Sequence, residues 1–233
     1  MKINHKFLEG IFIDRPNQFL TRVNYKGAVV ESHLPDPGRL KELLKPGVQI
    51  LLKKESGEHR KTKFSTQAVY DGNILISLNT LLPNKFTAYL LTERKIDFLK
   101  EWNIHKKEIP CGNHRFDFLF KRENEFLYLE VKSVTLVEKG IAKFPDVVTE
   151  GGGKHVEHLG AMAEKGIRTM VLFVVQRPDA KLFQPQWERD PKFGFSLHKA
   201  WQKGLEGRVI HMKMTPNNLL YLGELPFNLN PKS

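Results

Sequence analysis

The stretch that decides the fold of this chain is Arg115-Phe116-Asp117-Phe118, together with Glu130-Val131-Lys132 a short distance later. In both segments charged side chains alternate with apolar ones. Alternation with a period of two predicts half-buried β-strands, and the polar residues 121–125 between them supply a turn. The sequence therefore predicts a β-hairpin in which each strand carries a carboxylate on its polar face.

The length of the hairpin loop decides whether the two carboxylates meet. With an even loop at Glu123-Asn124, Arg122 pairs with Glu125. Asp117 then lies opposite Glu130, with the two Cβ atoms about 5 Å apart. An odd loop would send one of the acids to the other face of the sheet. An even loop therefore predicts that both acids, and Lys132 beside them, share one face.

Two carboxylates this close favour a cation between them. Neighbouring carboxylates repel each other unless positive charge intervenes, and hard cations such as Mg²⁺ take carboxylate oxygens as ligands. Lys132 could hold an attacking water or neutralise charge that develops on a phosphate. The hypothesis is a site in which Asp117 and Glu130 bind Mg²⁺ or Mn²⁺ and Lys132 assists hydrolysis. The alternative is a solvated strand face with cross-strand ion pairs.

The composition describes an ordinary globular protein of one large or two small domains, with 233 residues of which 40% are hydrophobic. No apolar run approaches the roughly 18 residues that a membrane helix requires. Residues 1–10 lack the apolar core of a signal peptide, and the single cysteine, Cys111, cannot form an internal disulfide. These features favour the cytoplasm and predict no membrane partner.

The net charge of +11 indicates a polyanionic partner. Such an excess of Lys and Arg attracts nucleic acid, which is the commonest polyanion in the cytoplasm. The alternative interpretation is general solubility. Nucleic-acid binding is therefore a hypothesis that the charge supports and that the motifs must strengthen.

Residues 1–80 contain several short apolar segments separated by Gly or Pro, at 11–13, 19–23, 28–30, 48–52, 66–70 and 74–78. This pattern predicts a small barrel, and a helix of one or two turns at 38–44 makes it resemble an OB-fold. A basic hairpin around 55–58 suits single-stranded nucleic acid, because lysines follow phosphates. Phe64 and Tyr70 on its returning strand are expected in the core. The basic residues of this hairpin are Lys53, Lys54, Arg60, Lys61 and Lys63.

Residues 81–233 read as an α/β domain. The predicted order is a helix at 85–102 capped by Asn84, the two acid-bearing strands with an extension at 133–137, and a helix at 154–164. A continuous apolar strand at 169–175 follows, and such a strand is typically buried on both faces. A helix near 196–204 and a strand near 209–214 extend the unit. Helices before and after a central sheet place this half in the α/β class.

The acid followed by Glu-x-Lys resembles the PD-(D/E)XK nucleases, and the chain as a whole resembles the sugar fermentation stimulation protein A (SfsA) family. The segments that carry this resemblance span nearly the full length: 19–23, 33–39, 79–80, 115–118, 130–135, 144–146 and 152–155. The resemblance implies an OB-fold-like first domain and a second domain of restriction-endonuclease-like PD-(D/E)XK type. It also implies DNA binding that depends little on sequence, and a link to sugar-utilisation genes such as those for maltose.

The resemblance also indicates where DNA would be contacted. It places Arg22, His33 and Arg39 at the functional face of the barrel. Residues 151–155 open a helix whose first N–H groups could receive a phosphate, although the family usually has Arg where this chain has Gly151. Glu93, on the preceding helix, is a further candidate acid. The candidate nucleic-acid contacts are Arg22, His33, Arg39, Lys53, Lys54, Arg60, Lys61, Lys63, Arg115, Lys154 and His155.

Two functions follow as hypotheses. The first is a Mg²⁺- or Mn²⁺-dependent deoxyribonuclease in which Asp117, Glu130 and Lys132 act on a phosphodiester. The second is a non-catalytic DNA-binding regulator of sugar-utilisation genes that uses the nuclease-like domain as a platform. The sequence leaves the oligomeric state open, a homodimer included.

Overall fold

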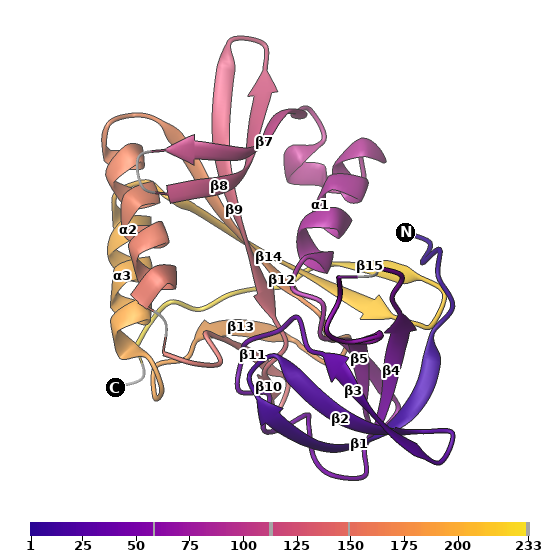
Figure 1. The fold of residues 1–233 in the computed structure, drawn as a ribbon. Helices are drawn as coiled ribbons and strands as arrows, with labels where there is room; N and C mark the ends of the chain where they lie inside the picture. The colour runs from indigo at the N-terminus through magenta and orange to yellow at the C-terminus, as the bar shows by residue number, and fades with distance from the viewer. Residues whose placement is uncertain (58, 112–113, 149, 232–233) are drawn as a thin grey trace.

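The computed structural model describes residues 1–57, 59–111, 114–148 and 150–231. Figure 1 shows a barrel built from the N-terminal strands beside a larger layered domain. The barrel strands are β1 (Leu8–Asn17), β2 (Leu20–Tyr25), β3 (Ala28–His33), β4 (Gln49–Lys54) and β5 (Phe64–Asp71). They follow the apolar segments that the sequence marks as strands.

The five strands close on themselves. β1 pairs with β2 and β4, β2 with β3, and β4 with β5, all antiparallel, while β3 pairs with β5 in parallel at Ser32↔Phe64 and His33↔Ser65. Closure removes the unpaired strand edges. Buried Phe12, Val23 and Ile50 fill the interior, and Phe64 packs against this core as expected. The predicted OB-fold-like barrel is confirmed in its strand pairing.

The helix expected at 38–44 is reduced to a single turn. The Leu43 and Leu44 N–H groups donate to the Leu40 carbonyl, and Leu40 has a positive φ of 50°. A backbone in the left-handed region cannot continue a right-handed helix. The segment is therefore a tight turn that carries Leu40 and Leu43 into the barrel core.

The second domain is an α/β layer structure. Its elements are β6 (Ile74–Ser77), α1 (Leu82–Thr92), a 3₁₀ turn (Asp97–Leu99), β7 (Asn103–Cys111), β8 (His114–Arg122), β9 (Glu125–Val134), β10 (Val137–Glu138), β11 (Ile141–Phe144), α2 (Glu150–Glu164), β12 (Arg168–Val175), β13 (Leu182–Pro185), α3 (Pro191–Gln202), β14 (Glu206–Met214) and β15 (Leu219–Glu224). The main sheet has the order β6-β14-β12-β9-β8-β7, and β5–β6 pairing joins it to the barrel. None of the helices in the described ranges could cross a membrane.

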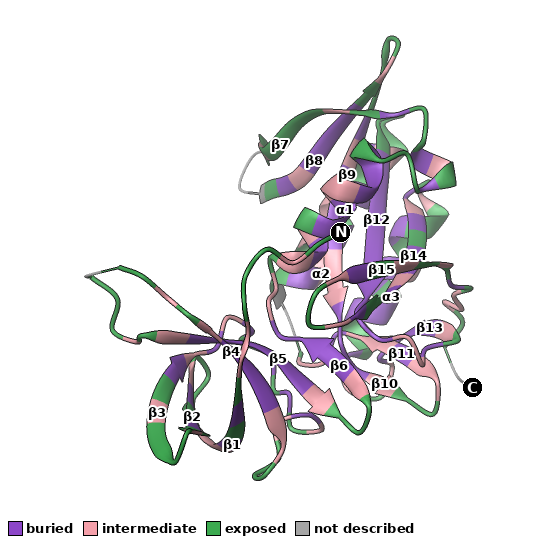
Figure 2. Ribbon diagram, turned by 90° about the vertical axis from the view of Figure 1, so that its right-hand side faces the viewer, coloured by how far each residue is buried: buried purple, intermediate pink, exposed green. Residues whose placement is uncertain are grey.

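Strand β12 shows how the sheet is covered on both faces. Met170, Leu172 and Val174 belong to the core that contains the α1 residues, whereas Val171, Phe173 and Val175 belong to the core under α2 and α3. The strand is parallel to both neighbours, β9 and β14. Figures 1 and 2 show this buried strand at the centre of the domain. The prediction of a strand buried on both faces is confirmed.

Two predicted elements of this domain differ in the structure, and one strand was not predicted. The helix expected at 85–102 ends at Thr92, where Arg94 takes a positive φ of 53°, and only the 3₁₀ turn follows. The extension expected at 133–137 stops at Val134. Strand β7 was not predicted, because its side chains are mostly exposed on both faces and an edge strand of that kind shows no regular alternation.

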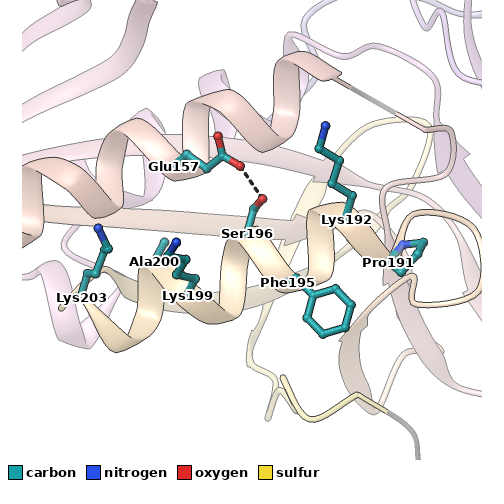
Figure 3. Close-up of a pocket in the computed structure, with 8 residues that line it drawn as sticks. All are labelled: Glu157, Pro191, Lys192, Phe195, Ser196, Lys199, Ala200 and Lys203. Carbon is teal, nitrogen blue, oxygen red and sulfur yellow. Dashed lines mark hydrogen bonds between the residues drawn. The ribbon is translucent and has the colours of Figure 1, made fainter.

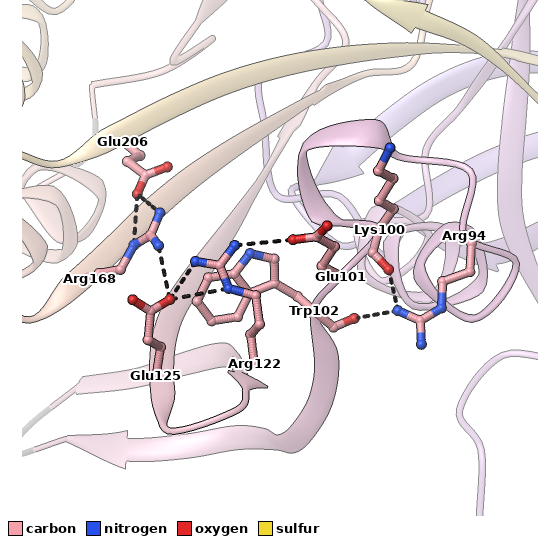
Figure 4. Close-up of polar contacts among 8 residues, drawn as sticks. All are labelled: Arg94, Lys100, Glu101, Trp102, Arg122, Glu125, Arg168 and Glu206. Atoms are coloured by element: carbon pink, nitrogen blue, oxygen red, sulfur yellow. Dashed lines mark hydrogen bonds and ion pairs between the residues drawn. The ribbon is translucent and has the colours of Figure 1, made fainter.

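Trp102 joins the chain after α1 to the tip of the β8–β9 hairpin. Trp102 is 4% exposed, and two guanidinium groups lie over its ring, with the Arg122 and Arg168 Cζ atoms 4.8 and 5.1 Å from the ring centre. Arg122 also pairs with Glu125 at 2.5 Å, and Arg168 pairs with Glu206 at 2.9 Å. Figure 4 shows that these side chains form one cluster across the hairpin, β12 and β14.

The barrel and the second domain meet at two carboxyl groups. Asp36, in the turn after β3, accepts from the Gly38 N–H at 2.8 Å, and Asp146, after β11, lies beside it. A Cβ added to Gly38 would come within 2.3 Å of Asp146 Oδ2 and 2.8 Å of Asp36 Oδ1. Burial, and then the charge of Asp146, raise the pKa of Asp36 to about 6. The glycine thus allows two acid-bearing segments to meet.

Replacing Asp36 by Asn should stabilise the protein at neutral pH. Because the pKa of Asp36 is raised on folding, its contribution to stability is fully present below pH 3.8 and is lost as pH rises through about 6. Asn can still accept from the Gly38 N–H but carries no charge. The free energy of unfolding of Asp36→Asn, relative to wild type, should therefore rise by about 2–3 kcal/mol between pH 4 and pH 7.

Denaturant unfolding at the two pH values measures this difference. Asp14→Asn is the matched control, because the hydrogen bond from Arg22 lowers the pKa of exposed Asp14, so neutralising it should not stabilise the protein at neutral pH. A stability difference for Asp36→Asn that stays constant across the pH range would contradict the prediction.

Candidate active site

The β8–β9 hairpin has the even register that the sequence favours. Arg122 pairs with Glu125, and the ladder runs back to Phe118↔Leu129. It stops there, one step before the Asp117–Glu130 pair. The Oδ2 atom of Asp117 accepts a hydrogen bond from the Val131 N–H at 2.7 Å. The Asp117 carboxylate therefore accepts a hydrogen bond from a backbone N–H of β9 at the point where the β8–β9 ladder ends.

The strict alternation of β8 also ends at this point. Phe118 belongs to the core that contains the α1 residues, but Phe116 belongs to the core under α2, with its ring 5.6 Å from the His158 ring. Asp117 lies between them. Arg115 is exposed and pairs with Glu108 at 3.4 Å, and the β8–β9 ladder does not reach it.

Asn84 holds the second oxygen of Asp117. It lies in the first turn of α1, and its side-chain Nδ2 donates to Asp117 Oδ1 at 2.5 Å. The sequence assigned Asn84 to the helix cap, but the helix begins after Leu81 with no side-chain cap. Glu93 is at the opposite end of α1, about 13 Å along the helix axis at 1.5 Å per residue. The α1 side chain that contacts Asp117 is therefore the Asn84 amide rather than the Glu93 carboxylate.

Glu130 is the most buried acid of the site, with 5% of its surface exposed. Its Oε1 accepts from Lys132 Nζ at 2.7 Å and lies 2.8 Å from His155 Nδ1. Its Oε2 is buried and has no hydrogen-bond partner among the described residues. Two cationic or hydrogen-bonding groups thus gather on one oxygen of Glu130 and leave the other available.

The charges of the two acids are coupled. Burial, and then the negative charge of Glu130, raise the pKa of Asp117 to about 6. Burial also acts to raise the pKa of Glu130, but the hydrogen bonds from His155 and Lys132 outweigh it and lower that pKa overall. The geometry therefore brings Asp117, Glu130, Lys132 and His155 into one electrostatic unit.

The donor set fits a hard cation. Carboxylate oxygens suit Mg²⁺, Mn²⁺ and Ca²⁺, and Glu130 Oε2 is a buried oxygen that lacks a partner. Within the described ranges, no group of three or more His, Cys, Asp or Glu side chains is arranged to hold a metal. Two carboxylates would therefore leave further positions to water or substrate oxygens, which is how Mg²⁺ is commonly bound.

The other sequence candidates are spread over the surface. Arg22 pairs with Asp14 through a 2.7 Å bond from its Nε, and both Lys53 and Arg60 lie beside Glu55, at 3.1 and 4.0 Å. His33 is half-buried at the end of β3. Besides Arg22, Arg60 and Arg115, the exposed members of the set are Arg39, Lys54, Lys61, Lys63 and Lys154. The contact roles of all these residues stay predictions.

Sequence reasoning missed two parts of the site. It placed His155 among phosphate contacts, whereas the structure places its ring against Glu130. It gave Asn84 only a capping role, whereas its amide holds Asp117. The pattern at 152–155 pointed to His155 but not to its partner, because the 24 residues between His155 and Glu130 carry no signal for their contact.

A cavity of about 350 Å³ lies between the barrel and β9. Its lining includes Gly38 from the barrel turn, Ser133 and Thr135 just beyond Lys132, and Asp146. The interface between the two domains is thus adjacent to β9, the strand that carries Glu130 and Lys132. The barrel can therefore contribute to the same surface as the candidate site.

Comparison with known proteins identifies both domains. Residues 13–78 match the family model described as the SfsA N-terminal OB domain, and residues 81–218 match the sugar fermentation stimulation protein RE domain. A sugar fermentation stimulation protein homolog from Clostridium botulinum (strain Hall) is 41% identical over 207 residues, covering 88% of this chain and 90% of that protein. A homolog from Clostridium kluyveri is 42% identical over 200 residues, covering 85% and 87%.

A solved structure agrees over nearly the whole chain. The structure of Pyrococcus furiosus SfsA in complex with Ca²⁺ superposes with a TM-score of 0.91 at 26% identity, covering 98% of both chains. The predicted fold class is confirmed: an OB-fold-like barrel precedes an α/β domain of restriction-endonuclease-like type.

Proposed function

Because this chain belongs to the sugar fermentation stimulation protein family, we propose that it binds DNA with little dependence on sequence and hydrolyses phosphodiester bonds with a divalent metal ion. The observation that carries the proposal is the cluster of Asp117, Glu130 and Lys132 at the point where β8 and β9 separate. A buried pair of acids whose charges disfavour each other is best explained by a cation that they share.

Asp117 and Glu130 would hold this metal, and Mg²⁺ or Mn²⁺ is the proposed ion. The Ca²⁺ in the Pyrococcus furiosus relative supports a divalent cation in the family. When bound, such an ion polarises a phosphoryl oxygen and lowers the pKa of a bound water. Asn84 and the Val131 N–H would orient Asp117 for this role, as outer hydrogen bonds commonly do for metal ligands.

Lys132 and His155 supply the remaining chemistry. The Lys132 ammonium, 2.7 Å from Glu130, would turn to the substrate phosphate and stabilise negative charge as it develops there. The His155 ring, which contacts the same oxygen of Glu130, would fix the orientation of that carboxylate. Lys132 comes from β9 of the central sheet and His155 from α2, so both groups are already beside Glu130 before DNA arrives.

DNA is the proposed partner because of the charge of the whole chain. With a net charge of +11, phosphate contacts supply affinity that carries no sequence information. Exposed Arg39, Lys61 and Lys63 on the barrel and Lys154 on α2 are the proposed contacts. The cytoplasmic location stays a prediction, and the oligomeric state stays open, a homodimer included.

Metal titration followed by DNA binding tests this function. Calorimetric titration with Mn²⁺ should show binding to the wild type and none to Glu130→Gln. DNA affinity should fall with salt, with a slope of about −0.9 in log K against log concentration for each phosphate contacted. Affinity that is insensitive to ionic strength would contradict DNA binding, and failure to cut any nucleic acid with any metal would contradict hydrolysis.

The second candidate function is a non-catalytic DNA-binding regulator of sugar-utilisation genes. The ion pairs on Glu130 favour it, because Lys132 and His155 can neutralise this acid without a metal. Under this function the protein would bind DNA with the same salt dependence, while the Mn²⁺ titration would give the same weak signal for the wild type and for Glu130→Gln.

A further inference from the structure

The two helices on the outer face of the sheet leave a groove between them. α2 and α3 approach most closely at Gly160, where an added Cβ would lie 2.7 Å from the Ala200 Cβ. Beyond this contact a cavity of about 670 Å³ opens (Figure 3). It is lined by Glu157 of α2 and by Pro191, Lys192, Phe195, Ser196, Lys199, Ala200 and Lys203.

The groove is positively charged along its length. Lys192, Lys199 and Lys203 follow one face of α3 and span about 16 Å at 1.5 Å per residue. Lys203 is paired with Glu164 at 2.6 Å. Lys192 and Lys199 form no ion pair with any described residue. The acid in the groove, Glu157, accepts from Ser196 Oγ at 2.6 Å. Two ammonium groups are thus available to an anionic ligand.

An exposed aromatic ring lines the same cavity. Phe195 is 59% exposed, and its ring meets the Trp187 ring edge-on with centres 5.3 Å apart. Trp187 packs tightly under Gly194, where an added Cβ would lie 2.4 Å from it. The ring of Phe195 is therefore supported from one side and open to solvent on the other. A supported ring beside lysines suits single-stranded nucleic acid, because bases stack on the ring while phosphates meet the lysines.

The groove extends along α2 toward the candidate active site. A second cavity of about 280 Å³ shares Glu157, Lys192 and Ser196 with it and extends to Gly153 and Lys154 at the start of α2. The next residue, His155, contacts Glu130 at 2.8 Å. A strand bound at Glu130 could therefore continue along α2 into the groove.

We propose that this groove binds the single-stranded part of the DNA substrate, so that the preferred substrate is a duplex with a single-stranded extension. Lys192 and Lys199 contact its phosphates, and Phe195 stacks on a base. An acidic peptide would satisfy the lysines, but the exposed aromatic ring, and a second cavity that reaches Lys154 beside His155, favour a nucleic-acid strand. The inference rests on the proposed DNA-binding function and names its substrate class.

Fluorescence anisotropy with three oligonucleotides tests the proposal: a blunt duplex, the same duplex with a single-stranded extension, and the extension alone. Wild type should bind the extended duplex more tightly than the blunt one. Lys192→Glu/Lys199→Glu should lose that preference, and its salt slope on the single strand should be smaller by about 1.4, since each phosphate contact contributes about 0.7. Phe195→Ala should weaken binding to the extension by about fivefold or more.

The matched control is Lys181→Glu/Lys213→Glu, which changes the net charge equally at exposed residues outside the groove. It should weaken all three DNAs alike and keep the preference. The inference is wrong if Lys192→Glu/Lys199→Glu retains the preference, or if an oligoglutamate peptide competes with wild type while the extension adds no affinity. Complete absence of DNA binding in wild type would instead overturn the proposed function itself.

Discussion

Replacing Lys132 by Ala is expected to lower the rate of Mn²⁺-dependent DNA cleavage by about 10²- to 10⁴-fold. The ammonium of Lys132 lies 2.7 Å from Glu130, and Ala removes the contribution of this group to stabilising charge on the phosphate. Glu130→Gln should be as damaging, because it removes a proposed metal ligand. The measurement is single-turnover cleavage of labelled DNA with saturating metal, so that the binding of DNA does not limit the rate.

Three comparisons make this prediction specific. DNA affinity of Lys132→Ala should change little, since the binding surface is much larger than one lysine. Asn84→Ala should lower the rate by about 10- to 100-fold, because the Asn84 amide orients Asp117 but is not itself a proposed metal ligand. Lys213→Ala, at an exposed residue of β14, should cleave normally. Cleavage by a folded Lys132→Ala protein at the wild-type rate would show that the nuclease activity arises elsewhere.

Replacing Trp102 by Ala is expected to destabilise the protein by about 3–5 kcal/mol. The ring is 4% exposed and belongs to the core between α1 and the sheet. Its removal leaves a cavity and also deprives the Arg122 and Arg168 guanidinium groups of the ring that they pack on (Figure 4). The free energy of unfolding from urea titration, with an unchanged dependence on urea concentration, measures the loss.

Trp201→Ala provides the comparison for this loss. Trp201 is 41% exposed and packs on Phe227 with ring centres 5.1 Å apart. Its replacement should cost about 1 kcal/mol, which is typical of partly exposed positions. Equal effects of the two substitutions would mean that the cluster around Trp102 does not hold the β8–β9 hairpin to the body of the domain.

Local patterns in the sequence determined the elements and their pairing in the central hairpin. Alternation of polar and apolar residues around Asp117 and Glu130 predicted two strands, and the Arg122↔Glu125 register agrees with the even loop. The apolar run at 169–175 predicted a strand buried on both faces, and β12 is one. Such patterns are readable because side-chain period and burial are properties of a single segment.

Local patterns failed where the backbone leaves the regular geometry. The spacing of apolar residues predicted a helix as far as Trp102, but the helix ends at Thr92 and Arg94 has a positive φ. At Leu40, a positive φ reduces another expected helix to a single turn. Neither residue is Gly or Asn, the residues that usually mark such positions. Strand β7 lies at the sheet edge, where exposure on both faces removes the alternation that would have revealed it.

The sequence by itself determined the two fold classes and the acids and lysine of the candidate site. Only the tertiary structure decided that Asn84 holds Asp117, that His155 contacts Glu130, and that Asp36 meets Asp146 at Gly38. These partners are 33, 25 and 110 residues apart in the chain. Their contacts depend on how α1, α2 and the barrel pack against one sheet. No periodicity within a segment records that packing, because it is set by surfaces that come together only when the whole chain has folded.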